Sequence, residues 1–99
     1  MPIRNNLEHH QFELDSDGHT GFLVYRASGN NLYLDHTEVP EALEGKGIGG
    51  QLAKAALEFA REKSLEVIPV CPFILSYLRR HPEFSDVVAP RYRAQFKPA

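Results

Sequence analysis

Glu44-Gly45-Lys46-Gly47-Ile48-Gly49-Gly50 is the stretch around which the chain is organised, and it holds four of the seven glycines. The stretch from Gln51 to Lys63 follows it and predicts an amphipathic helix, with apolar residues three and four apart. Those apolar positions are Ile48, Leu52, Ala55, Ala56, Phe59 and Ala60. A glycine-rich turn that opens a helix leaves unpaired N–H groups at the positive end of the helix dipole. This local structure predicts an anion site, and phosphates are its usual ligands.

The number of glycines favours phosphate contact over turn chemistry alone. Glycine near the start of a helix costs up to about 1 kcal/mol relative to alanine, and the glycines within 47–50 exceed what one turn requires. Residues 45–50 also match the dinucleotide pattern G-x-G-x-x-G, with Glu66 downstream. That fingerprint turns directly from strand to helix, whereas residues 40–44 intervene here. A nucleotide-binding domain is therefore a weaker alternative, and the P-loop motif is absent.

Composition and charge exclude several classes of protein. The 99 residues predict one small domain with a core large enough to fold without disulfides or metals. The net charge of -2 indicates neither wholesale nucleic-acid binding nor a membrane surface, and no apolar run has the length of a transmembrane helix. The single cysteine, Cys71, predicts a reducing, cytoplasmic setting. No His/Cys spacing supports a metal site.

The first part of the chain predicts an antiparallel meander. Residues 7–14, 20–27 and 32–39 are rich in side chains that favour strands. Turn signals at 16–18 and 28–31 separate these three segments. Because both connections are short, we expect neighbouring strands to pair as hairpins.

The second part predicts a crossover connection and a second helix. After the amphipathic helix, residues 65–70 form a short apolar run that predicts a buried strand parallel to the third strand. Pro72 suits the first turn of a second helix over 73–80, and residues 84–88 predict one more short strand. Residues 89–99, with two prolines and several basic side chains, predict a mobile tail.

This order of elements predicts a single domain over residues 1–99, of the α/β (α+β) class with one mixed sheet. Ligands of such sheets gather at the carboxyl ends of the strands. The ends of the third and fourth strands would meet there. They carry His36, Thr37, Glu38, the glycine turn and Cys71.

Four motifs, in this order and spacing, resemble the minimal GNAT-like N-acetyltransferase family. They are His36-Thr37-Glu38-Val39-Pro40, Gly45-Lys46-Gly47-Ile48-Gly49, Cys71-Pro72-Phe73 and His81-Pro82-Glu83-Phe84. Glu44, Gly47 and Gly49 occupy the specified places of the family's coenzyme A loop, Q/R-x-x-G-x-G/A, with Glu44 where Arg or Gln is usual. The resemblance implies a fold in which two central strands separate and hold acetyl-coenzyme A in the gap. Much of the acceptor-binding region of the larger enzymes is missing.

The resemblance also implies a set of residues that bind coenzyme A. The set is Val39, Glu44, Gly45, Lys46, Gly47, Ile48, Gly49, Gly50, Arg79 and Arg80. Backbone N–H groups of residues 45–50 would hold the pyrophosphate, and backbone groups of Val39 would pair with the pantetheine arm. Lys46 either adds positive charge or is solvated. Arg79 and Arg80 either reach the 3′-phosphate or are solvated at the end of their helix.

Acetyl transfer to an amine also needs a base for the acceptor and a proton for the departing thiolate. Cys71 is a nucleophile, a neighbour of the acetyl group or a plain core residue, and we favour the second role. Tyr77 resembles the tyrosine that protonates the thiolate in this family, but a tyrosine on an apolar helix face is more often core. His36 and Glu38 lie two residues apart and therefore share one strand face, so both are candidate bases. The alternative is that they have a structural role.

The sequence therefore predicts an acetyl-coenzyme A-binding N-acetyltransferase that moves an acetyl group to an amine of a protein or small molecule. The alternative is an acyl-coenzyme A-binding sensor or accessory module without turnover, because the acceptor region is truncated. Neither reading names the acceptor, and neither requires a metal, a nucleic acid or a membrane.

Overall fold

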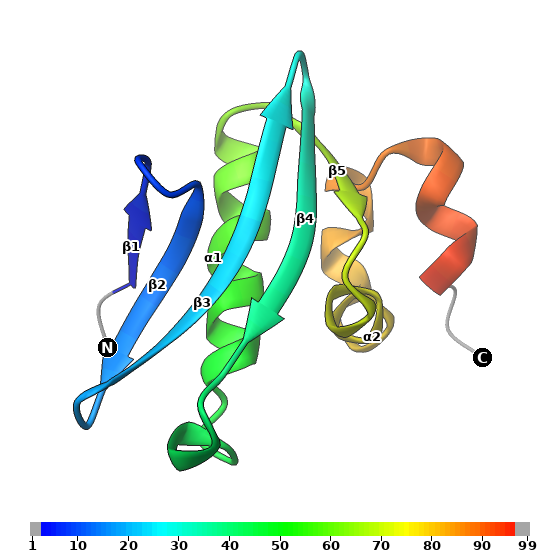
Figure 1. The fold of residues 1–99 in the computed structure, drawn as a ribbon. Helices are drawn as coiled ribbons and strands as arrows, with labels where there is room; N and C mark the ends of the chain where they lie inside the picture. The colour runs from blue at the N-terminus through cyan, green and yellow to red at the C-terminus, as the bar shows by residue number, and fades with distance from the viewer. Residues whose placement is uncertain (1–2, 97–99) are drawn as a thin grey trace.

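The computed structural model describes residues 3–96, which form a five-stranded sheet, two α-helices and three 3-10 helices (Figure 1). The strands are β1 (Ile3–Asn6), β2 (Gln11–Ser16), β3 (His19–Ser28), β4 (Asn31–Glu38) and β5 (Glu66–Pro69). The helices are α1 (Ile48–Glu62), α2 (Pro72–Arg80), η1 (Glu41–Leu43), η2 (Pro82–Val87) and η3 (Pro90–Phe96). Strands β1 to β4 are antiparallel neighbours in chain order, and β5 is parallel to β4. The α+β fold with one mixed sheet, a meander followed by helix–strand–helix, is confirmed.

The β2–β3 hairpin follows from its two turn residues. Asp17 has φ 51° and Gly18 has φ 78°, so both adopt the left-handed conformation. Ser16 pairs directly with His19 across this two-residue turn. Such turns match the twist of the paired strands and fix their register.

Strand β1 was not expected from the sequence, and the strand expected over residues 7–14 begins only at Gln11. β1 is polar, so no hydrophobic alternation marks it. It is held to β2 by backbone pairing and by Glu13, a buried carboxylate. Glu13 accepts hydrogen bonds from Arg4 Nε at 2.7 Å, from Asn6 Nδ2 at 3.1 Å and from the Gln11 amide. These bonds, the one from Gln11 first, hold the pKa of Glu13 below its usual value.

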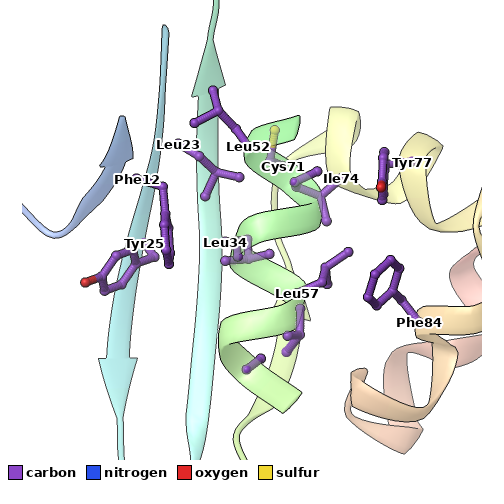
Figure 2. Packing of buried hydrophobic residues seen from close by; sticks show 14 of the residues in the cluster. Phe12, Leu23, Tyr25, Leu34, Leu52, Leu57, Cys71, Ile74, Tyr77 and Phe84 are labelled. Carbon is purple, nitrogen blue, oxygen red and sulfur yellow. The ribbon is translucent and has the colours of Figure 1, made fainter. Parts of the chain in front are cut away.

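Helix α1 covers one face of the meander, and α2 lies beside β5 (Figure 1). The sheet face toward the viewer in Figure 1 carries no helix within the described residues. The core lies between α1, α2 and the covered face, as Figure 2 shows. Its fully buried side chains include Leu23, Leu34, Leu52, Leu57 and Ile74. Burying one such side chain contributes about 1.5–3 kcal/mol.

Two glycines allow the first turn of α1 to pack closely on both sides. A Cβ atom at Gly21 on β3 would lie 2.9 Å from Cγ2 of Ile48. A Cβ atom at Gly49 would lie 2.8 Å from Cζ of Phe73 on α2. Both distances are shorter than van der Waals contact, so a larger residue at either position would force Ile48 or Phe73 to shift.

The last part of the described chain differs from the prediction. The strand expected over residues 84–88 is instead the 3-10 helix η2, because Pro82 opens a helical turn and Phe84 and Val87 are buried three residues apart. Only Val88 keeps a strand-like bridge, to Val67 of β5. The segment 89–99, expected to be a mobile tail, contains η3. The last part of this segment, residues 97–99, lies outside the described residues.

Helix η3 is held by tertiary contacts that have no signal in the sequence. Ala89 is fully buried and donates its backbone N–H to Val67 at 2.9 Å. Arg93 donates from Nε to the Val88 carbonyl at 3.0 Å. Tyr92 packs against the core. These contacts tie the segment after η2 to β5 and α2.

Gly49→Ala is expected to lower the free energy of unfolding by about 1–3 kcal/mol, because the new methyl group overpacks Phe73. Gly50→Ala is the matched control in the same helical turn, since its Cβ would lie 3.7 Å from Tyr77 Cε2, an ordinary contact. We expect Gly50→Ala to be neutral or stabilising by up to about 1 kcal/mol. Urea unfolding measures both variants. Equal stabilities would contradict the proposed close packing of Gly49.

Candidate functional site

The first turn of α1 is an uncapped helix N-terminus. Its N-cap, Gly47, is left-handed with φ 74°, and no side chain caps the turn. The first backbone bond of the helix runs from the Gln51 N–H to the Gly47 carbonyl at 3.1 Å. Within residues 3–96, the N–H groups of residues 47–50 have no hydrogen-bond acceptor. Four N–H groups at the positive end of a helix form a site for an anion.

These N–H groups open onto a pocket of about 370 Å³. One wall is formed by Val39 directly after β4, by η1 and by the first turn of α1. The other wall is formed by α2 and His81. The lining residues are Val39, Leu43, Glu44, Gly45, Gly47, Ile48, Gly49, Gly50, Phe73, Tyr77, Arg80 and His81. The structure therefore brings together most of the binding residues expected from the sequence, with Tyr77 added to them.

Lys46 and Arg79 are the two expected binding residues that do not line this pocket. The Lys46 ammonium forms an ion pair with Asp17 on the β2–β3 turn, and both side chains are exposed to solvent. Arg80 does line the pocket, and its Nε donates to the Ser76 carbonyl at 3.4 Å. The positive charge on the α2 wall therefore comes from Arg80.

Tyr77 lies at the N–H end of the pocket. Its ring is next to Gly50 across the two helices and is only 5% exposed. Its hydroxyl makes no hydrogen bond within the described residues. The oxygen is not fully buried, so solvent or a ligand can reach it. Burial, and secondarily Glu83 and Glu58, raise the pKa of Tyr77. A tyrosine that keeps its proton in this position is a hydrogen-bond donor to a ligand.

Cys71 lies where β4 and β5 separate. The two strands pair only as far as Leu34 and Pro69, and the Cys71 N–H then bonds to the Leu34 carbonyl at 2.9 Å. Cys71 is the N-cap of α2 and is 5% exposed (Figure 2). Its Sγ lies 3.7 Å from the Thr37 hydroxyl, so a weak S–H···O bond spans the gap between β4 and α2. Cys71 itself is not among the pocket-lining residues.

His36 and Glu38 share a face, but it is not the face of Cys71. Thr37 pairs with Leu23, whose side chain is buried in the core beneath α1. His36 and Glu38 pair with Val24 and Phe22 and so point to the uncovered face of the sheet. Their side chains are 59% and 60% exposed, and His36 Nε2 lies 3.8 Å from Glu38 Oε1.

Sequence reasoning gave no role to four residues that the structure places at the site. Leu43, Phe73 and His81 line the pocket, and Thr37 contacts Cys71. Strand alternation could have separated Thr37 from its two neighbours once a partner strand was known. The spacing of four between Tyr77 and His81 could have placed both on one side of α2.

A second cavity of about 330 Å³ lies between the end of α1, the start of β5 and η2. Arg61 and Arg93 line it, but both are already bonded within the chain. Arg61 contacts Asp86 at 2.6 Å, and Arg93 donates to the Val88 carbonyl at 3.0 Å. This cavity therefore offers less free positive charge to an anion than the first pocket.

Two classes of feature are absent from the described part of the chain. No helix within residues 3–96 is long and apolar enough to cross a membrane. No three His, Cys, Asp or Glu side chains of these residues gather as a metal site would require.

Comparison with known proteins identifies the class. The model of the GCN5-related N-acetyl-transferase family matches residues 11–87, so the chain belongs to this family. It is similar to Protein NATD1 of Mus musculus, at 34% identity over 98% of this chain and 87% of that protein. It is likewise similar to Protein NATD1 of Gallus gallus, at 32% identity over 99% and 86%.

A solved structure supports the same assignment. The NMR solution structure of a GCN5-like protein from Staphylococcus aureus matches with a TM-score of 0.71 and 31% sequence identity. The match covers 89% of this chain and 87% of that one. Both the sequence and the backbone arrangement therefore place the chain in the GCN5-related N-acetyltransferase family.

Proposed function

We propose that this chain binds acetyl-coenzyme A at the first turn of α1 and transfers its acetyl group to an amine. The observation that carries the proposal is the set of unpaired N–H groups of residues 47–50, which open onto a pocket in a member of this family. A pyrophosphate supplies the anionic oxygens that these donors need. Arg80 on the opposite wall supplies a full positive charge.

The separation of β4 from the chain after β5 supports a place for the acyl arm. Past Leu34, the outer edge of β4 is no longer paired with β5, so its backbone groups are available to the amide groups of pantetheine. Val39 lies at the start of that path and lines the pocket. Cys71 and Thr37 lie beside the same gap. In this proposal the pantetheine arm leaves the pocket at Val39 and runs along β4 toward Cys71, where the thioester would lie.

The chemistry assigned to the chain is direct acyl transfer. The amine nitrogen attacks the thioester carbonyl, the carbon–sulfur bond breaks, and the thiolate takes up a proton. The raised pKa of Tyr77 keeps its hydroxyl protonated as a donor at neutral pH, although its contact with Gly50 also suits a phosphate ligand. His36 and Glu38 lie on the uncovered sheet face, where a base would serve an amine arriving from that side. We propose a cytoplasmic setting, in which Cys71 stays a free thiol.

A binding module without turnover is the second candidate. It is favoured by the exposure of His36 and Glu38 and by their position on the opposite sheet face from Cys71. Acetyl-coenzyme A binding is common to both functions. Turnover with a panel of protein and small-molecule amines separates them, because a sensor binds and releases acetyl-coenzyme A unchanged.

Gly50→Val is expected to weaken acetyl-coenzyme A binding at least about tenfold, because its side chain enters the pocket between the N–H groups and Tyr77. Lys46→Ala is the control and should change the affinity less than about twofold, since Lys46 does not line the pocket. Calorimetry at matched stability, with NAD as a second ligand, measures both. Unchanged affinity in folded Gly50→Val, or tighter binding of NAD, would contradict the assignment.

Cys71→Ala is expected to keep its affinity for acetyl-coenzyme A and to lose only part of its turnover, because we place Cys71 beside the acetyl group without covalent attachment. The covalent route requires thiolate attack, release of coenzyme A thiol and an acetylated Cys71 that passes its group to the amine. Intact mass measurement after incubation without acceptor detects that species. An added acetyl group mapped to Cys71, with turnover abolished in Cys71→Ala, would prove the covalent route instead.

A further inference from the structure

His81 is a pocket residue with no role in the function proposed so far. It is the C-cap of α2, directly after Arg80, and its side chain is 39% exposed. Its ring stacks on Tyr77 with centroids 4.1 Å apart and planes at 22°. Tyr77 in turn contacts the position of Gly50 at 3.7 Å. One aromatic ring therefore separates His81 from the free N–H groups of α1.

Glu83 holds the His81 ring in place. His81 Nδ1 lies 3.2 Å from Glu83 Oε2 and forms a hydrogen bond with it. Glu83 belongs to η2, and His81 is the residue directly before η2. The pKa of Glu83 is lowered, first by a hydrogen bond from its own backbone N–H and further by His81. Glu83 is therefore a carboxylate across the neutral range, and its Oε2 accepts a hydrogen bond from the Nδ1–H of His81. The remaining ring nitrogen, Nε2, makes no hydrogen bond within the described residues, and His81 lines the pocket.

The charges around His81 come from several elements. Helix α2 contributes the Arg80 guanidinium and the neutral hydroxyl of Tyr77, and η2 contributes the Glu83 carboxylate. The opposite wall contributes the Glu44 carboxylate. From α1, the charge of Glu58 raises the pKa of Tyr77, and the charge of Arg61 lowers the pKa of Glu83. An anion bound at the N–H groups would face Arg80 and His81 together. An imidazole can be neutral or protonated, so His81 is the side chain of this wall that can gain a positive charge when an anion binds.

We propose that His81, oriented by Glu83, is a proton-coupled ligand of the phosphate groups bound at the first turn of α1. When the anion binds, His81 takes up a proton on Nε2 and donates it as a charge-assisted hydrogen bond to a phosphate oxygen. Affinity then rises as the pH falls, because binding of the anion takes up a proton. This inference rests on the proposed coenzyme A site and adds to it a side chain that sets its pH dependence.

The test is calorimetry with 3′-dephospho-coenzyme A between pH 5.5 and 8. This probe keeps the pyrophosphate diester but lacks the phosphomonoester, whose own titration near pH 6 would obscure that of the protein. Wild type should bind about tenfold more weakly at pH 8 than at pH 5.5, as expected for the loss of one charge-assisted hydrogen bond. His81→Gln should bind with an affinity that changes less than about twofold. His9→Gln, at an exposed histidine outside the pocket, should behave as wild type.

Two further variants keep the test decisive if His81→Gln is unstable. His81→Arg keeps a planar cation on Tyr77 at every pH, so its affinity should stay high and independent of pH. Glu83→Gln keeps the histidine but removes the carboxylate that orients its ring, so its affinity at pH 5.5 should fall toward that of His81→Gln. A pH dependence unchanged in the His81 variants would overturn this inference and leave the coenzyme A site standing. Absence of binding of either coenzyme A or its dephospho form to wild type at any pH would overturn the proposed function and this inference with it.

Discussion

The structure depends on how the first turn of α1 is packed without being capped. This turn is pressed between β3 and α2, where Gly21 and Gly49 leave room for Ile48 and Phe73. Its N-cap is a glycine in the left-handed conformation, which offers no side chain to its own N–H groups. Packing therefore fixes the position of the helix end, while its donors stay free for a ligand. The energy for this arrangement comes from the apolar core behind it and not from the turn itself.

The wall opposite this turn explains why the donors form a pocket and not merely an exposed helix end. Helix α2 begins where β5 leaves β4, at Cys71, and runs across the first turn of α1. Its successive contacts are Phe73 against Gly49, Tyr77 beside Gly50 and His81 against Tyr77. One short helix thus links the gap near Cys71 to the phosphate end of the site. Two parts of the proposed function share a single structural support.

The sequence could predict what is local and periodic. The glycine turn, α1 and α2 follow from spacing and from the conformational needs of glycine and proline, and most of the predicted binding residues line one pocket. β1 could not be predicted, because it has no hydrophobic alternation and is held by Glu13 on another strand. The strand expected over residues 84–88 is instead η2, because a short apolar run by itself does not distinguish a strand from a helical turn.

The site residues that were harder to place depend on contacts between distant parts of the chain. Lys46 lies outside the pocket because its partner, Asp17, is on the β2–β3 turn. The exposure of His36 and the contact of Thr37 with Cys71 depend on strand register, which sequence spacing alone does not fix. The catalytic roles of these side chains stay predictions, whereas the family of the chain is established by comparison.

The most direct measurement of the central claim is an NMR titration of the ¹⁵N-labelled protein with acetyl-coenzyme A. If the free N–H groups hold the pyrophosphate, the amide resonances of residues 47–50 should show the largest shifts and saturate together at one affinity. The amides around Arg61 and Arg93, at the second cavity, should move little. Saturable binding that leaves residues 47–50 unshifted and moves the second cavity instead would contradict the account.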